Sequence, residues 1–280
     1  MTPGTSSRTF KIAVIQYQPE IGALTRNLAA MEDRIRKAHA AGAALIVLPE
    51  LADSGYVFET EDEVAALSGP IPDGRSATML CDLAVELGVY IASGLAEAAD
   101  GTFYNSAILC GPEGYLGTYR KLHLWNREKL FFAPGNLGLP VFDTSLGRIG
   151  LAVCYDGWFP ETFRTLADNG AEIVCVPTNW VPMPDQEPEA EAMANTLHKA
   201  AAHSNGLYIA CADRVGTERG QPFIGQSLIV GPNGFALAGP ADRVDEAILI
   251  AEVDPGRLSK VWQVNEFNNK HSDRRRDVYS

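Results

Sequence analysis

The chain has 280 residues, of which 46% are hydrophobic and 21% are charged, so its composition is that of an ordinary globular protein and excludes a disordered or fibrous one. The 35 Asp and Glu residues outnumber the 23 Lys and Arg residues, which gives a formal net charge of −12. Because this excess of negative charge repels nucleic-acid phosphates and anionic lipids, neither nucleic acid nor a membrane is expected as a partner.

Short apolar runs alternate with longer amphipathic segments along the chain. In chain order they predict a strand at 11–17, a helix at 24–41, a strand at 43–48, a helix at 76–87, strands at 89–95, 103–109, 115–119, 139–143 and 149–153, a helix at 160–169, a strand at 173–176, a helix at 189–204, and strands at 207–212, 227–230 and 247–253. The Gly-Pro-Glu-Gly turn at 111–114 makes two consecutive strands antiparallel. The sequence therefore predicts an α/β fold whose sheets are mixed rather than purely parallel.

A single domain, 1–280, is expected, because no repeat, low-complexity tract or charge block marks a boundary. It has a short polar N-terminal tail at 1–9 and a polar, basic C-terminal tail at about 262–280, and the Pro-rich loop 181–188 is too short to be a linker. The polar start lacks the apolar stretch of a secretory signal, and no apolar run reaches the roughly 20 residues of a membrane-spanning helix. We therefore expect a cytoplasmic protein.

The cysteines and histidines give no sign of a metal site. Five cysteines are present and no two are spaced C-x-x-C, so a zinc knuckle or redox dithiol is not indicated. His198 and His203 are five residues apart and cannot share one face of a helix, as an H-E-x-x-H site requires. Motifs that bind nucleotides, G-x-G-x-x-G and G-x-x-x-x-G-K-[ST], are absent, as is the G-x-S-x-G motif of serine hydrolases.

Cys154 differs from the other cysteines in its surroundings. It follows the apolar strand and precedes a turn, and Pro160 and Glu161 then suit the start of a helix. Ligands gather at such strand ends in α/β folds, and nearby backbone N–H groups favour a thiolate. Cys175 and Cys211 fall in the middle of strands, where a place in the core is the simpler interpretation.

Charged residues also follow two other strands. Glu50 comes directly after one apolar strand and Lys121 after another, with Glu128 seven residues further on. Taken singly, each could be an ordinary surface residue. Together, a carboxylate, an ammonium and a thiol are the groups needed for thiol attack on a carbonyl or nitrile, because the acid accepts the thiol proton and the cation stabilises the oxyanion.

Three segments carry a resemblance to a known family. LPELADSGY (48–56), YRKLHL (119–124) and GLAVCYDGWFPE (150–161) resemble, in order and spacing, the three signature blocks of the nitrilase superfamily of carbon–nitrogen hydrolases. The resemblance runs through nearly the whole chain and implies a four-layer α-β-β-α sandwich that works without cofactor or metal. It also implies that members pair through the helices flanking the nucleophile, so a homodimer or larger homo-oligomer is expected, with the basic tail as a candidate contact to the partner.

The same resemblance implies a role for each site residue. Glu50 matches the general base, Lys121 the oxyanion stabiliser and Cys154 the nucleophile. Glu128 matches the second glutamate, which positions the lysine and the substrate, and the backbone N–H of Tyr155 is expected to complete the oxyanion hole. The expected reaction is hydrolysis of a small amide to acid and ammonia through an acyl thioester.

The residues after the nucleophile favour the amidase branch of the superfamily. Nitrilases usually show Cys-Trp-Glu, whereas this chain has Cys154-Tyr155-Asp156, although some short microbial nitrilases resemble this pattern and a nitrilase stays an alternative. An N-carbamoyl hydrolase is a weaker alternative, because Gly157 and Trp158 stand where such enzymes carry arginines. A binding protein that has lost turnover is disfavoured by the presence of all four site residues, and a papain-like enzyme using His203 lacks that family's motif.

The expected substrate pocket is aromatic. Five residues within or beside the signature blocks are candidates to line it: Tyr56, Trp125, Trp158, Asn179 and Trp180. Such a lining suits an uncharged aliphatic or arylalkyl acyl group. The alternative for these aromatic side chains is that some of them only pack the core.

Overall fold

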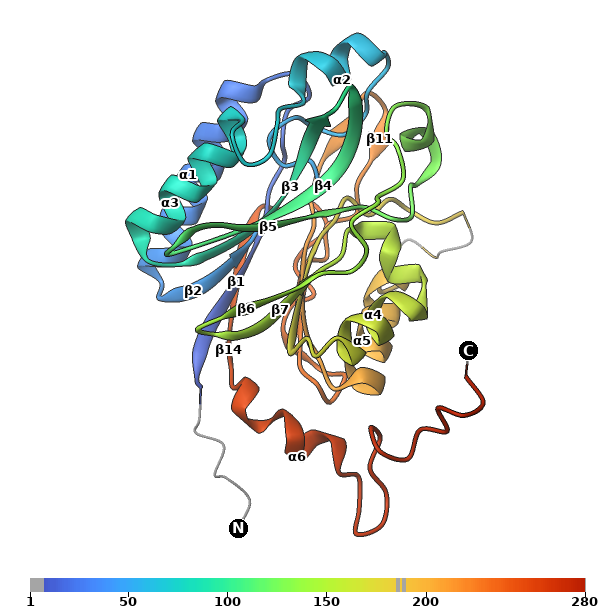
Figure 1. The fold of residues 1–280 in the computed structure, drawn as a ribbon. Helices are drawn as coiled ribbons and strands as arrows, with labels where there is room; N and C mark the ends of the chain where they lie inside the picture. The colour runs from blue at the N-terminus through green and yellow to red at the C-terminus, as the bar shows by residue number, and fades with distance from the viewer. Residues whose placement is uncertain (1–7, 185–186, 188–189, 280) are drawn as a thin grey trace.

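The computed structural model describes residues 8–184, 187 and 190–279, and its centre consists of two six-stranded sheets that face each other (Figure 1). The first has the order β14-β1-β2-β3-β4-β5, and the second has the order β13-β12-β9-β8-β7-β6. The strands of the first are β14 (Ala247–Val253), β1 (Phe10–Gln16), β2 (Ala43–Val47), β3 (Tyr90–Ala99), β4 (Thr102–Gly111) and β5 (Gly114–Arg120). Those of the second are β13 (Ala236–Ala238), β12 (Leu228–Val230), β9 (Tyr208–Ala212), β8 (Ile173–Pro177), β7 (Gly147–Leu151) and β6 (Val141–Thr144).

Helices cover the outer face of each sheet. The first sheet carries α1 (Leu24–Ala40) and α3 (Arg75–Leu87), and the second carries α4 (Pro160–Asp168) and α5 (Met193–Asn205) (Figure 1). This confirms the predicted α-β-β-α sandwich. The sheets are mixed, as predicted: β1, β2 and β3 are parallel, as are β7, β8 and β9, whereas the hairpins β3–β4, β4–β5 and β6–β7 are antiparallel.

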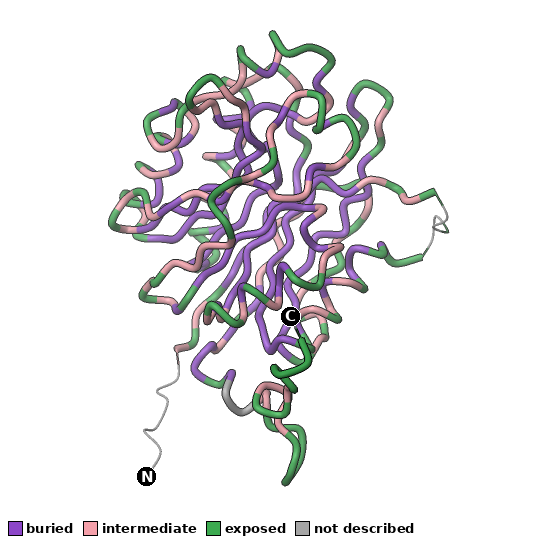
Figure 2. Tube along the Cα trace, turned by 45° about the vertical axis from the view of Figure 1, so that its right-hand side comes forward, coloured by how far each residue is buried: buried purple, intermediate pink, exposed green. Residues whose placement is uncertain are grey.

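The alternation of side chains along each strand builds two apolar layers. In β1, Ile12 and Val14 point into the layer between the sheets, while Ala13 and Ile15 pack toward α1 and α3. Because successive side chains of a strand point to opposite faces, a strand buried on both faces needs an unbroken apolar run. The buried strands accordingly occupy the middle of the molecule in Figure 2.

The structure also has elements that the apolar pattern does not predict. Helix α2 (Glu61–Leu67) buries little and is capped at its N-terminus by Thr60, whose hydroxyl accepts a hydrogen bond from the N–H of Glu63. The short strand β13, the small hairpin of β10 (Thr217–Glu218) and β11 (Gln221–Pro222), and α6 (Leu258–Trp262) are likewise new. The helix predicted at 189–204 begins at Met193, and its predicted first residue lies outside the described residues. Short elements escape prediction because few of their residues are buried.

The C-terminal tail leaves the sandwich after α6 and returns toward α4 (Figure 1). There Arg274 forms an ion pair of 2.7 Å with Asp168, the last residue of α4. Its apolar side chains Val264 and Phe267 are exposed. No helix in the described part of the chain is long and apolar enough to cross a membrane.

Candidate active site

The candidate residues come from loops that follow three strands in two different sheets. Glu50 follows β2 and Lys121 follows β5 in the first sheet, whereas Cys154 follows β7 in the second. The approach of β3 to the Glu50 loop is close: a Cβ on Gly94 would lie 2.4 Å from the Cα of Glu50, so only glycine fits there. The strand ends meet, and the structure brings together side chains that are up to 104 residues apart in the sequence (154 − 50 = 104).

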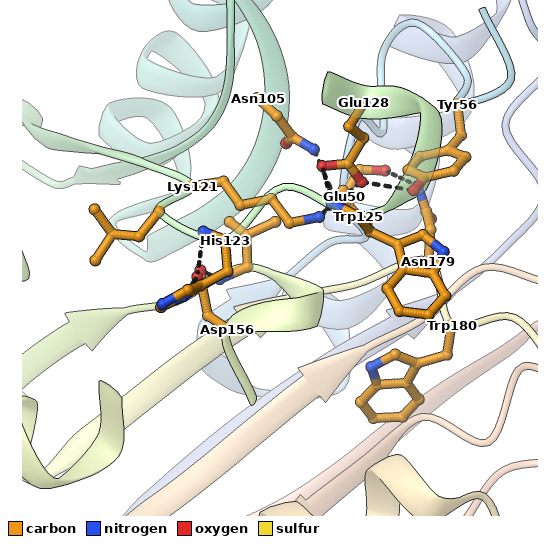
Figure 3. Close-up of polar contacts among 12 residues, drawn as sticks. Glu50, Tyr56, Asn105, Lys121, His123, Trp125, Glu128, Asp156, Asn179 and Trp180 are labelled. Carbon is orange, nitrogen blue, oxygen red and sulfur yellow. Dashed lines mark hydrogen bonds and ion pairs between the residues drawn. The ribbon is translucent and has the colours of Figure 1, made fainter. Parts of the chain in front are cut away.

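A buried cluster of three charged side chains forms the centre of the site (Figure 3). The Nζ atom of Lys121 lies 2.6 Å from Oε1 of Glu50 and 2.8 Å from Oε1 of Glu128. The side chains of Lys121 and Glu50 are 0% exposed and that of Glu128 is 4% exposed. We call these three residues the Lys121 cluster. One cation between two carboxylates gives the cluster one net negative charge when all three groups are ionised.

Neutral side chains hold the two carboxylates in place. Asn105 donates from Nδ2 to Oε1 of Glu50 at 2.7 Å, and the Tyr56 hydroxyl donates to Oε1 of Glu128 at 2.6 Å. The backbone of Tyr56 is fixed in turn, because its N–H donates to Glu218 at 2.8 Å and Glu218 pairs with the buried Arg214. Asn105 has a detectable signal in the sequence, since it is a polar residue within an apolar strand.

One oxygen of the cluster remains open. Oε2 of Glu50 is buried and has no hydrogen-bond partner among the described residues. Burial raises the pKa of Glu50 to about 7, the positive charge of Lys121 opposes this and the negative charge of Glu128 adds to it. For Lys121, burial lowers the pKa, but the charges of Glu128 and Glu50 outweigh burial and hold the pKa above its ordinary value. Glu50 can therefore exchange a proton near neutrality beside a permanent cation.

Cys154 begins the short 3-10 helix Cys154–Trp158 in a left-handed backbone conformation, with φ of 47°. Such a conformation is strained for a side chain larger than glycine and persists only where the surroundings hold it. The thiol is buried, which raises its pKa well above the ordinary value; the negative charge of Glu50 raises it further, while the positive charge of Lys121 lowers it. The resting thiol is therefore neutral and requires a base when it attacks.

Four of the five predicted pocket residues lie together with Cys154. They line one pocket, here called the thiol cavity, whose lining is Trp125, Cys154, Tyr155, Trp158, Asn179, Trp180, Val181 and Met183. Tyr56 instead lines a neighbouring cavity with Glu128, and Trp125 and Val181 line both cavities. The walls of the thiol cavity are mainly aromatic and apolar.

Two pocket residues also have structural contacts. Asn179 donates from Nδ2 to the backbone carbonyl of Glu50 at 2.9 Å, so its side chain also supports the loop that carries Glu50. Trp180 is 2% exposed and its ring lies 5.3 Å from that of His198, so it packs the core as well as lining the cavity. Tyr155 follows Cys154 in the 3-10 helix, at the end where the first N–H groups lack partners within the helix.

The histidines are engaged elsewhere. His123 contacts Asp156 through Nδ1 at 2.7 Å, and His203 is exposed with Nδ1 3.0 Å from the carbonyl of Asn233. Buried His198 donates to the carbonyl of Ala194, and burial lowers its pKa to about 4. No histidine is among the described residues that line the thiol cavity, which gives no support to a papain-like arrangement with His203. In the described ranges, no three His, Cys, Asp or Glu side chains are arranged to hold a metal ion.

The chain is similar to known sequences over most of its length. The sequence model of the carbon-nitrogen hydrolase family matches residues 11–262. A nitrilase of Pyrococcus abyssi is 42% identical over 269 residues, covering 96% of this chain and 98% of that protein. An N-carbamoylputrescine amidase of Solanum lycopersicum is 32% identical over 292 aligned positions, covering 98% of this chain and 94% of that protein.

Solved structures are similar over almost the whole chain. A carbon-nitrogen hydrolase from Helicobacter pylori G27 has a TM-score of 0.86 at 29% identity, with 97% of each chain covered. A mutant of the amidase from Nesterenkonia sp. AN1, solved in complex with butyramide, has a TM-score of 0.76 at 27% identity, with 96% of this chain and 95% of that chain covered.

Proposed function

The chain belongs to the carbon-nitrogen hydrolase family, the nitrilase superfamily, and on this premise we propose that it hydrolyses a small neutral amide to an acid and ammonia through a thioester on Cys154. It is a hydrolase of carbon–nitrogen bonds other than peptide bonds. The observation that carries the proposal is the Lys121 cluster beside the thiol: a cation held between two carboxylates, one of which has an open oxygen.

In the first half of the reaction, the sulfur of Cys154 attacks the amide carbon while Glu50 accepts the thiol proton. The negative charge that develops on the carbonyl oxygen is stabilised by the ammonium of Lys121 and the N–H of Tyr155. Glu50 then gives its proton to the amide nitrogen, the carbon–nitrogen bond breaks, and ammonia leaves an acyl thioester. A base is required because the buried thiol is neutral at rest.

In the second half, Glu50 accepts a proton from a water molecule that attacks the thioester carbon. The carbon–sulfur bond breaks, the acid is released, and the sulfur regains a proton from Glu50. One carboxylate thus serves twice as base and twice as acid in one cycle, which works best with a pKa near the working pH. Burial raises the pKa of Glu50 in this direction. Glu128 keeps the ammonium of Lys121 aligned from the other side.

The lining of the thiol cavity supports an uncharged acyl group. Trp125, Trp158 and Trp180 offer large flat apolar surfaces, and no Lys or Arg is among the described residues of its lining that could pair with a substrate carboxylate. A short aliphatic or arylalkyl primary amide fits this chemistry. The butyramide seen in the Nesterenkonia amidase mutant is a compound of this class.

Nitrile hydrolysis is the second candidate, because the Pyrococcus relative at 42% identity bears the name nitrilase. The same thiol attack on a nitrile carbon would give a thioimidate, and two waters in succession would yield the acid and ammonia. Hydrolysis of an N-carbamoyl amine is a third candidate, favoured by the name of the Solanum relative. All three reactions use the same four side chains and differ in what the cavities accept.

Ammonia release from matched pairs tests the choice: butyramide with butyronitrile, and phenylacetamide with phenylacetonitrile. The Cys154→Ala variant is the blank, and Cys175→Ala, which changes a buried thiol in the middle of β8, is the matched control. We expect turnover of the amides by the wild type and by Cys175→Ala, and a thioester adduct on Cys154 in the mass spectrum of the quenched enzyme. Turnover of the nitriles alone would replace the proposal with a nitrilase, and full activity of Cys154→Ala would refute the thioester.

We further propose a homodimer or larger assembly to which the tail after α6 contributes. The exposed Val264 and Phe267 support this, since Phe267 is 83% exposed. Truncation after Asn265 should lower the number of subunits per particle, obtained from the molecular mass that light scattering measures in solution. An unchanged number of subunits would contradict the role of the tail.

A further inference from the structure

The carboxylate of Asp156 stands out among the buried acids because four donors converge on it. Its Oδ2 accepts from the N–H of Val153 at 2.9 Å and from the hydroxyl of Tyr119 at 2.6 Å. Its Oδ1 accepts from the N–H of His123 at 3.1 Å and contacts Nδ1 of the same residue at 2.7 Å. Asp156 is 0% exposed, so these contacts replace water completely. We call Tyr119, His123, Val153 and Asp156 the Asp156 clamp.

The clamp residues lie close to both reacting groups in the sequence. Val153 and Asp156 stand on either side of Cys154, and Tyr119 and His123 stand on either side of Lys121. Val153 and Asp156 follow β7 of the second sheet, whereas Tyr119 lies near the end of β5 in the first sheet and His123 follows that strand. The clamp therefore joins the two sheets at the point where the thiol and the ammonium must meet. Figure 3 shows the contact of His123 with Asp156 beside the Lys121 side chain.

We propose that Asp156 is a positioning residue, which fixes the Cys154 thiol relative to Lys121 by locking the nucleophile turn onto the end of β5. The inference rests on the proposed thiol chemistry and adds to it a residue that touches neither substrate nor reacting atoms. A displacement of about 1 Å between reacting groups can reduce a rate about 10²-fold, so the loss of this alignment would show as a lower rate.

The turn around Cys154 is strained and is held by hydrogen bonds of the clamp. Cys154 adopts φ of 47°, and the turn around it is closed twice: the N–H of Asp156 donates to the carbonyl of Val153 at 3.0 Å, and the N–H of Val153 donates back to the Asp156 carboxylate. On the other side, the Tyr119 hydroxyl accepts from the N–H of Leu122 at 3.1 Å, which tightens the turn that carries Lys121. Strained conformations persist when surrounding contacts hold them, and these contacts do so.

Asparagine cannot replace the aspartate in this clamp. An Asn side chain has the same shape but presents one NH₂ group in place of an oxygen. If the NH₂ takes the place of Oδ2 it faces the N–H of Val153, and if it takes the place of Oδ1 it faces the N–H of His123. The Tyr119 hydroxyl and the His123 ring can reverse their roles, but a backbone N–H cannot. In either orientation one donor faces another, so Asp156→Asn breaks the clamp without creating a cavity.

The test compares Asp156→Asn with Asp254→Asn in amide hydrolysis and in alkylation of Cys154 by iodoacetamide. Asp254 is a matched control, because its carboxylate also accepts from two backbone N–H groups, those of Arg8 and Gly256, at the far end of β14. For Asp156→Asn we expect kcat about 10²-fold lower with KM changed less than about threefold, and slower alkylation. For Asp254→Asn we expect both constants and the alkylation rate near those of the wild type, whatever happens to its stability.

Tyr119→Phe keeps the inference testable if Asp156→Asn does not fold. It removes the hydroxyl that donates to Asp156 and accepts from the N–H of Leu122, and it leaves the two backbone N–H contacts of Asp156 in place. We expect a roughly fivefold to tenfold lower kcat with an unchanged KM. The positioning role would be overturned if folded Asp156→Asn had the kcat and the alkylation rate of the wild type. If Asp156→Asn does not fold, the same result in Tyr119→Phe would overturn it. A wild type that hydrolyses no amide or nitrile would overturn the proposed function instead, and the alkylation rates would then decide on the clamp by themselves.

Discussion

The Lys121 cluster and the Asp156 clamp are two charged regions near the ends of strands in both sheets. They differ in how many hydrogen-bond donors meet their carboxylate oxygens. In the clamp, each oxygen of Asp156 meets two donors. In the cluster, Glu50 keeps one oxygen without a partner among the described residues, and its pKa is raised by burial. A buried carboxylate whose acceptors are all used holds structure together, whereas one with an open acceptor can take a proton during a reaction.

The difference has a consequence for stability. Leaving a buried polar atom unpaired costs about 1–3 kcal/mol, so the open oxygen of Glu50 is retained at the expense of folding free energy. Active sites are commonly the places where a protein gives up stability for function. Removing the charge of Glu50 should therefore leave stability close to that of the wild type, whereas removing the charge of Asp156 should lower it; both changes should lower the rate.

Glu50→Gln should give the largest loss of activity. The amide cannot accept the thiol proton, so we expect kcat to fall by at least about 10³-fold, while the free energy of unfolding stays within about 1 kcal/mol of the wild type. The control is Glu97→Gln, which changes a buried carboxylate that pairs with Arg120 at 2.6 Å; it should lose stability and keep most of its kcat. Steady-state kinetics and urea unfolding measure both. A Glu50→Gln variant with near wild-type kcat would remove Glu50 as the base.

Lys121→Met should give the largest loss of stability. It leaves two buried carboxylates without their cation, which costs about 3–5 kcal/mol for a broken buried pair. Lys121 lowers the pKa of Glu50, so without it the folded-state pKa rises further above the unfolded value, and stability falls as pH increases through that range. Urea unfolding should thus show a greater loss at pH 8 than at pH 5. The exposed Lys129→Met is the control and should change stability by less than about 0.5 kcal/mol; an equal loss at both pH values would contradict the prediction.

The pH dependence of kcat/KM should report Glu50. The unprotonated carboxylate is the active form, so kcat/KM should rise as pH increases through about 7. The negative charge of Glu128 raises the pKa of Glu50, so Glu128→Gln should move this rise to lower pH, besides lowering the rate. Asp254→Asn, distant from the site, should leave the midpoint where it is. A shift to higher pH in Glu128→Gln would contradict the effect of the Glu128 charge on the pKa of Glu50.

Tyr56→Phe should give the smallest loss of rate among the variants at or beside the Lys121 cluster. It removes the hydroxyl that donates to Glu128 at 2.6 Å but leaves Lys121 paired with both carboxylates, so we expect kcat to fall roughly tenfold. Tyr115→Phe is the control: Tyr115 is exposed, its hydroxyl contacts Thr118 at 2.8 Å, and the kcat of this variant should equal that of the wild type. Equal rates for both variants would show that Glu128 holds its position without Tyr56.

The sequence and the structure agree best where the physical signal is local. Unbroken apolar runs such as that of β2 predicted buried strands, and the hairpin at 111–114 predicted mixed sheets. Helix α2 and strand β13 were missed because they bury few side chains and so leave little apolar pattern. Residues at strand ends, Glu50, Lys121 and Cys154, could be selected as candidates because a charge or thiol directly after an apolar strand is unusual.

The sequence by itself determined the family, the layered α/β fold and the candidate reacting groups, because motif spacing and apolar periodicity are properties of short segments. Only the tertiary structure decided which partners each group has. It separated Tyr56 from the thiol cavity, gave Asn105 to Glu50, and surrounded Asp156 with donors from both sheets. These contacts join residues far apart in the chain, and whether a buried oxygen is satisfied or open depends on all of its neighbours at once, which no local pattern in the sequence records.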